Sequence, residues 1–131
     1  MRPLFLLALL AAAALPAAGK PLNDHSRGGR LYAQACASCH LPDGAGVPYL
    51  QPPLAGDPVI AMDSPNLLID VILKGPLTAL PPGSRPSWPV QMPAFASWPD
   101  RDVAALATFL RRVIGGHSQA VTAAQVAARR G

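Results

Sequence analysis

The stretch Cys36-Ala37-Ser38-Cys39-His40 decides how the rest of the chain is interpreted. Two thiols three positions apart can add to the two vinyl groups on one edge of a single porphyrin. The histidine that follows them can reach beneath the ring and offer an imidazole nitrogen to iron. This combination is the attachment signature of c-type haem. The stretch therefore predicts one covalent haem c, bound through Cys36 and Cys39, with His40 as an iron ligand.

Two cysteines at this spacing have three other interpretations, namely a structural disulfide, a thioredoxin-like redox pair and half of a zinc site. A zinc site would need two more ligands, and besides His40 the chain offers His25 and His117, which lie near its ends and are expected at the surface. A thioredoxin-like pair should follow a strand, whereas this pair ends a helical pattern and precedes a loop. Haem attachment is the favoured interpretation.

Residues 1–19 have the pattern of a cleaved secretory signal peptide. Arg2 is followed by an uncharged apolar run over residues 4–15, and Ala17 and Gly19 are the small residues that precede a cleavage site. Such a run spans about 18 Å of a hydrocarbon core about 30 Å thick, so its retention as a membrane anchor is less favoured. We therefore expect residues 20–131 to form one periplasmic domain without stable membrane insertion, with residues 115–131 as a tail.

Composition limits the partners that the chain can have. The sequence of 131 residues carries 11 Lys and Arg against 7 acidic residues, all of them Asp, and the basic residues are scattered. This balance does not favour binding to nucleic acid. A mature chain of this size has a marginal core of its own, and the aromatic residues are few. A large apolar cofactor at its centre would complete that core.

Hydrophobic periodicity predicts an all-α fold of about three or four short helices. The first runs from residue 23 or 24 to 37, with Asp24 as its cap, although the pair Gly28-Gly29 favours a later start or another element packed against the backbone. The second covers residues 66–73 after a proline, with an apolar stripe read as core. The third begins near Pro99 and ends before Gly115-Gly116. Its buried stripe is expected at Val103, Leu106, Leu110 and Val113, with Phe109 beside it.

A fourth, short helix is expected in the tail. Thr122 and Gln125 have the spacing of a capping box. Arg129 and Arg130 follow it and are expected at a solvated end of the chain.

Two segments rich in proline separate these helices. Residues 42–58 predict an irregular loop, and a loop of this length needs something to wrap around, such as the edge of a haem. Pro52, Leu54 and Val47 are candidates to pack on the ring, and a backbone carbonyl near Pro52-Pro53 is a candidate acceptor for the second ring nitrogen of His40. Residues 76–93 predict a stiff segment that is neither helix nor strand.

Met92 is the best candidate for the sixth iron ligand. A thioether is a soft neutral donor that raises the reduction potential and leaves no open position on the iron. Met62 is the rival within the mature chain, and we interpret it as core filler. The stiff segment that ends in Met92-Pro93 favours Met92.

These features together resemble the class I c-type cytochromes, over about residues 26–114. The residues that carry the resemblance are Gly28, Tyr32, the Cys36–His40 motif, Pro52-Pro53-Leu54, Met92-Pro93, Leu106 and Phe109. The resemblance implies that the first and last helices of the domain cross at a contact between glycine and aromatic residues. It also implies a small monohaem electron carrier. The tail resembles that of cytochromes that serve as subunits of periplasmic dehydrogenases.

The function expected from the sequence is the transfer of single electrons between redox proteins, with haem iron bound by His40 and Met92 and no catalysis by the chain itself. Its partners would be a dehydrogenase, a terminal oxidase or both. One alternative is a permanent haem subunit of a dehydrogenase or oxidase complex. Another, less favoured, is a haem sensor or enzyme with a labile sixth ligand. A haem-free thiol protein is the remaining possibility.

Overall fold

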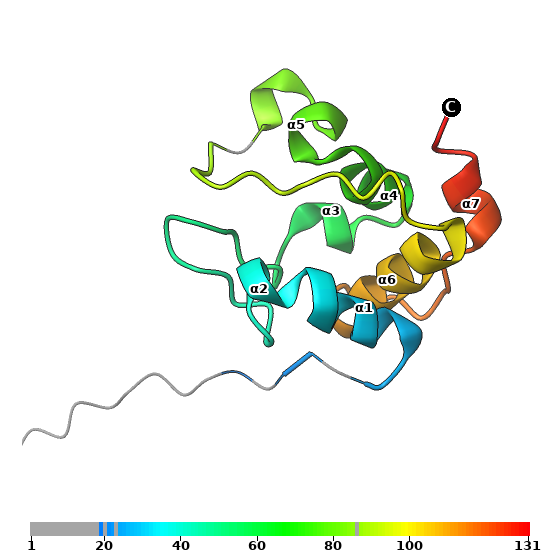
Figure 1. Cartoon of the computed structure of the whole chain (residues 1–131), viewed down its shortest axis with the longest axis horizontal. Coiled ribbons are helices and arrows are strands. Elements are labelled where there is room, and N and C mark those ends of the chain that lie inside the picture. Colours follow the sequence, from blue (N-terminus) through cyan, green and yellow to red (C-terminus); the bar gives the residue numbers. More distant parts are fainter. Residues whose placement is uncertain (1–18, 20, 23, 86) are drawn as a thin grey trace, which may run out of the picture.

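The computed structural model describes residues 19, 21–22, 24–85 and 87–131 (Figure 1). The predicted signal peptide, apart from Gly19, lies outside these residues. The described residues form only helices, turns and loops, with one isolated bridge between Val47 and Gln51. The elements are α1 (Arg27–Ala35), α2 (Ala37–His40), α3 (Pro58–Ala61), α4 (Asn66–Lys74), α5 (Pro76–Ala79), η1 (Pro82–Ser84), α6 (Asp100–Val113) and α7 (Ala123–Ala127). The all-α prediction is confirmed.

None of the helices in the described part of the chain is both long and apolar enough to cross a membrane.

The first helix begins later than its earliest predicted start. Ser26, not Asp24, is its N-cap, and the Ser26 hydroxyl accepts a hydrogen bond from the Gly29 amide at 3.0 Å. Asp24 instead accepts a hydrogen bond from the amide of Ser26 at 3.0 Å, so the prediction that Asp24 caps the helix is wrong. A serine cap two residues later leaves the glycine pair within the first turn of α1, where glycine costs less than in a helix interior.

The core of the fold is the crossing of α1 over α6, seen in the lower half of Figure 1. A Cβ atom on Gly28 would lie 2.2 Å from the carbonyl oxygen of Ala105 and 2.5 Å from Phe109 Cβ, so the two backbones meet at this glycine. The rings of Tyr32 and Phe109 pack beside it in a tilted arrangement, with centroids 5.7 Å apart and an angle of 42° between their planes. The contact between glycine and aromatic residues that the resemblance implied is confirmed.

Helix α6 buries most of the stripe that its sequence predicts. Val103, Leu106, Phe109 and Leu110 are all buried. The prediction for Val113 is wrong, since this side chain is 41 % exposed. Ile114, the next residue, packs against the core in its place, because the helix ends there and the chain turns away at Gly115-Gly116.

The segment 76–93 is more regular than predicted. The expectation that it contains no helix is wrong, because α5 and η1 lie within it. Pro76 and Pro82 stand in the first turn of each, where the missing N–H of proline costs nothing. The prolines that argued against helix therefore start short helices. From residue 87 to Pro99 the segment is irregular, as expected.

The tail packs against the domain through α7. The predicted capping box is present, since the Thr122 hydroxyl accepts from the Gln125 amide and the Gln125 side chain accepts from the Thr122 amide. Val126 is fully buried. Arg130 is exposed and Arg129 is partly buried, as a solvated end predicts, but each also forms an ion pair with the domain that was not expected.

Arg129 binds Asp70, a buried carboxylate of α4 that also pairs with Lys74 at 3.3 Å. Burial by itself would raise the pKa of Asp70, but the hydrogen bonds from Arg129 and Lys74 outweigh it and lower the pKa. Asp70 is therefore ionised at neutral pH, and the tail closes on a charged partner. The periodicity of the tail gives no sign of this pairing, which joins residues 59 apart in the chain.

Candidate functional site

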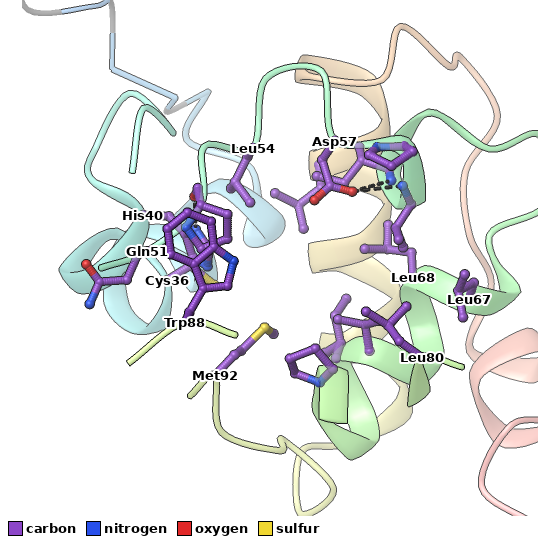
Figure 2. Close-up of a pocket in the computed structure, with 18 of the residues that line it drawn as sticks. Cys36, His40, Gln51, Leu54, Asp57, Leu67, Leu68, Leu80, Trp88 and Met92 are labelled. Atoms are coloured by element: carbon purple, nitrogen blue, oxygen red, sulfur yellow. Dashed lines mark hydrogen bonds between the residues drawn. The ribbon is translucent and has the colours of Figure 1, made fainter. Parts of the chain in front are cut away.

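A cavity of about 550 Å³ opens beside the Cys36–His40 motif. Its volume lies within the range of about 300–1,000 Å³ that is common for cofactor sites. The lining is mainly apolar, and its polar members are Cys36, Cys39, His40, Gln51, Asp57, Ser84 and Gln91. Figure 2 shows the two sides, with Cys36 and His40 at the left wall and Leu67, Leu68 and Leu80 at the right.

His40 is the last residue of α2, and its ring is held in one orientation. Its Nδ1 lies 3.0 Å from the carbonyl oxygen of Pro52. A neutral imidazole that donates from Nδ1 to a carbonyl keeps its lone pair on Nε2. The predicted contact with the Pro52-Pro53 region is confirmed, and it leaves Nε2 of His40 as the nitrogen able to bind a metal.

Both cysteines line the same cavity as His40. They are free thiols, one just before α2 and the other within it. Burial, together with the nearby Cys39, raises the pKa of the Cys36 thiol to about 11. Thioredoxin-like cysteines need a lowered pKa, because the thiolate is the reactive form. The environment of Cys36 therefore does not favour that interpretation.

Tyr32 fixes the turn by which the chain leaves the motif. Its hydroxyl donates a hydrogen bond to the carbonyl oxygen of Leu41 at 2.7 Å. Leu41 follows His40 and has a φ of 64°, a conformation that a branched side chain adopts at a cost. The buried Tyr32 ring thus links the α1–α6 crossing to the position of His40.

We expect Tyr32→Phe to lower the free energy of unfolding by about 1 kcal/mol, because it removes this one hydrogen bond and keeps the ring packed on Phe109. Urea unfolding of the haem-loaded protein, followed by circular dichroism, measures the change. Tyr49→Phe is the matched control, since Tyr49 is 88 % exposed and its loss should change stability by less than about 0.5 kcal/mol. Equal effects of the two substitutions would contradict the assignment.

The sulfur of Met92 reaches the cavity from the segment that precedes α6. Figure 2 shows this side chain extending upward into the cavity from the loop below. Met62 also lines the cavity, but it is 48 % exposed and lies between α3 and α4. Its backbone carbonyl accepts a hydrogen bond from the buried Arg111 at 2.6 Å. Both methionines therefore have access to the cavity, and the partly buried Met92 is the better shielded one.

Of the other predicted site residues, Pro52 and Leu54 line the cavity. Val47, His25 and His117 do not belong to its lining. The loop 42–58 thus brings Pro52 and Leu54 to the site. It places the Pro52 carbonyl next to His40 and buries Leu54.

Sequence reasoning missed much of the far wall. Leu67 and Val71 were taken as core, yet they are only half-buried and line the cavity together with Leu80 and Trp88. The apolar positions of α4 cover more than one face, because Ile69 and Leu73 are buried on the other side. That excess of apolar residues over a single stripe was the available signal.

These residues fit a covalently bound haem. The cavity has the volume of a cofactor site and apolar walls, and two free thiols stand on one wall beside an imidazole with Nε2 available. The chemistry of this donor set, two thiols and a soft thioether with one imidazole, matches the needs of a porphyrin that is attached at its edge.

Comparison with known proteins finds a matching protein family. Residues 23–110 match the protein family described as cytochrome c oxidase, cbb3-type, subunit III. The matched range contains the motif, Pro52, Leu54 and Met92. It ends before the tail.

Several curated relatives are similar over about three quarters of the chain or more. The cytochrome c subunit of alcohol dehydrogenase (quinone) from Gluconobacter oxydans is 36 % identical over 98 residues, which are 74 % of this chain and 20 % of the relative. The subunit of the same name from Gluconacetobacter polyoxogenes is 38 % identical over 101 residues, which are 76 % of this chain and 21 % of that subunit. The gluconate 2-dehydrogenase cytochrome c subunit from Pantoea cypripedii is 35 % identical over 112 residues, which are 82 % of this chain and 25 % of that subunit. The chain thus spans about a fifth to a quarter of the length of these relatives.

Proposed function

The chain belongs to the cytochrome c family and carries covalent haem c, and from this premise we propose that it transfers single electrons through an iron ligated by His40 and Met92. Cys36 and Cys39 would hold the haem by two thioether bonds. The observation that carries the proposal is that both candidate ligands and both thiols line one apolar cavity.

The chain's own groups divide the work between them. Bound haem would supply the one-electron chemistry, through the ferric and ferrous states of its iron. The carbonyl oxygen of Pro52 accepts from Nδ1 of His40 and fixes the imidazole ring, which would leave Nε2 free to bind the iron. Met92 offers a neutral thioether, which favours the ferrous state and raises the reduction potential. The apolar walls from α4 and α6 would exclude water from the bound cofactor, and ligation by both His40 and Met92 would leave no open position on the iron for a substrate.

We expect Met92→Ala to abolish the far-red sulfur-to-iron absorption band of the ferric protein. The reduced variant should bind carbon monoxide readily, because the sixth position on its iron is open. The parent, in which Met92 fills that position, should bind little. The covalent haem should remain, since neither thiol is changed. Optical spectra before and after reduction under carbon monoxide measure all three effects.

Met62→Ala is the matched control, because Met62 lines the same cavity. It should leave the far-red band and the weak carbon monoxide binding unchanged. Loss of the band in Met62→Ala with its retention in Met92→Ala would assign the sixth ligand to Met62. Absence of the band in the parent protein would exclude methionine ligation altogether and would favour the haem sensor or enzyme.

As electron donor we propose a periplasmic dehydrogenase, with an oxidase as a further partner. The support is that the relatives described above are cytochrome c subunits of dehydrogenases. The same similarity favours a second candidate, a haem subunit or domain held permanently in such a complex. Size-exclusion chromatography of the native protein distinguishes them, since a stable heteromer with a catalytic subunit would exclude the free carrier.

A further inference from the structure

The loop that carries Met92 comprises residues 87–99, and its Phe95 and Trp98 pack against the core. It contains no helix or strand, so its position depends on contacts with its neighbours. At its centre the Phe95 amide donates to the carbonyl oxygen of Ile72 at 2.9 Å, and the rings of Phe95 and Trp98 pack 4.8 Å apart. Near Met92 itself, Gly75 lets the loop approach the end of α4, since a Cβ there would lie 3.3 Å from the Met92 carbonyl oxygen.

The second half of this Met92 loop is held by one side chain from the far end of the chain. Arg130 donates to the carbonyl oxygen of Ala96 at 2.6 Å and to that of Trp98. It also pairs with the carboxylate of Asp100, the first residue of α6, at 2.5 Å. One planar guanidinium fork therefore binds three acceptors spaced over five residues.

The tail that presents Arg130 is itself anchored to the domain. The Val121 amide donates to the Thr108 hydroxyl at 2.8 Å, and Val126 is fully buried. Arg129 pairs with the ionised Asp70 on α4, the helix to which the Met92 loop is also bonded. Figure 1 shows α7 packed beside α6, close to where the loop enters that helix. The Met92 loop is thus bonded to two elements, to the tail through Arg130 and to α4 through the amide of Phe95.

We propose that Arg130 is a positioning residue for the sixth iron ligand, through which the tail keeps the Met92 loop closed over the haem cavity. The proposal rests on the ligation by Met92 proposed above. Arg130 touches neither the cavity nor Met92, and it acts through the carbonyls of Ala96 and Trp98. The residues that match the family end at 110, so Arg130 lies outside the matched range, whereas the loop that it binds lies inside it.

The test is the rate at which imidazole replaces the sixth ligand of the ferric haem protein, measured by stopped flow at saturating imidazole. At saturation this rate reports the opening of the Met92 loop. We expect Arg130→Ala to raise it about tenfold, because charged hydrogen bonds to the loop are lost. Hydrogen exchange of residues 93–98, measured by mass spectrometry, should accelerate to a similar extent, with α1 unchanged.

Arg112→Ala is the matched control. Arg112 donates to the Ser118 carbonyl in the same tail at 3.3 Å and makes no contact with the Met92 loop. Its substitution should leave both rates within twofold of the parent. If Arg130→Ala does not accumulate as folded protein, Asp100→Asn weakens the same contact from the other side and should raise the imidazole rate in the same direction.

The outcomes separate this proposal from the one on which it rests. A parent protein with the far-red band and an Arg130→Ala variant with parental imidazole and exchange rates would overturn the role of Arg130 and leave Met92 ligation intact. An equal rise in Arg112→Ala would overturn it too, because loosening the tail anywhere would then suffice. A parent without the far-red band would instead overturn the ligation by Met92.

Discussion

Gly28→Ala should destabilise the protein by about 3 kcal/mol and lower its melting temperature by roughly 15 °C. The added methyl group would lie 2.2 Å from the carbonyl oxygen of Ala105, where no atom can be accommodated. That carbonyl belongs to the backbone of α6, so relief requires the two helices to separate and the packing of Tyr32 on Phe109 to loosen. The higher helix propensity of alanine, about 1 kcal/mol, offsets only part of this cost. Thermal unfolding of the haem-loaded protein by circular dichroism measures the effect.

Two other glycines provide a graded control for this substitution. At Gly29 the nearest atom to an added Cβ is the Asp24 carboxylate at 2.7 Å, a side chain that can move away, so Gly29→Ala should cost less than about 1 kcal/mol. At Gly83 nothing lies within 4 Å, and Gly83→Ala should be neutral. If the three substitutions have equal effects, the crossing of α1 and α6 does not depend on close approach at Gly28.

The crossing of α1 and α6 was predictable because it follows from the apolar periodicity of α6 and from the resemblance to the class I c-type cytochromes. The stripe of α6 fixes its buried face, and Gly28 with Tyr32 marks where a partner helix must approach. The cap of α1 was missed because Asp24 and Ser26 are both good capping residues, and only the fold decides which of them meets the Gly29 amide. Helices α5 and η1 were missed because proline was weighed as a helix breaker, whereas in the first turn it starts a helix.

The candidate site was predictable on the side of the motif, and on the far side only at Met92. The motif and the loop 42–58 lie close together in the chain, and the hydrogen bond from His40 to Pro52 spans twelve residues. The far wall comes from α4 and from residues 80–92, whose apolar side chains look the same in the sequence whether they face a core or a cofactor. The ion pairs of Arg129 and Arg130 were missed for a related reason, since a charge near the end of a chain is usually solvated.

The second large effect concerns the thiols. Cys36→Ala combined with Cys39→Ala should give a colourless chain that lacks a cooperative thermal transition. Without covalent haem the cavity of about 550 Å³ has no filler, and its apolar walls would face water. From the cost of cavities in protein cores, the empty cavity should lower the free energy of unfolding by on the order of 10 kcal/mol. That loss is comparable with the whole stability of a domain of this size. The haem absorbance of the purified protein, a haem stain after denaturing electrophoresis and circular dichroism on heating measure the outcome.

Ser38→Ala is the control, because Ser38 lies between the two thiols and does not line the cavity; it should retain haem and a parental transition. Met92→Ala provides the sharper contrast, since it should keep the covalent haem and the fold while losing the sixth ligand. A double cysteine variant that unfolds cooperatively without haem would contradict the prediction. It would mean that α1, α4 and α6 form a sufficient core through contacts such as Tyr32 with Phe109, and that the haem occupies a site the chain builds unaided. The expected loss of cooperativity instead makes the haem the largest single element of the core, which is why so small a chain can leave a wide opening between its helices.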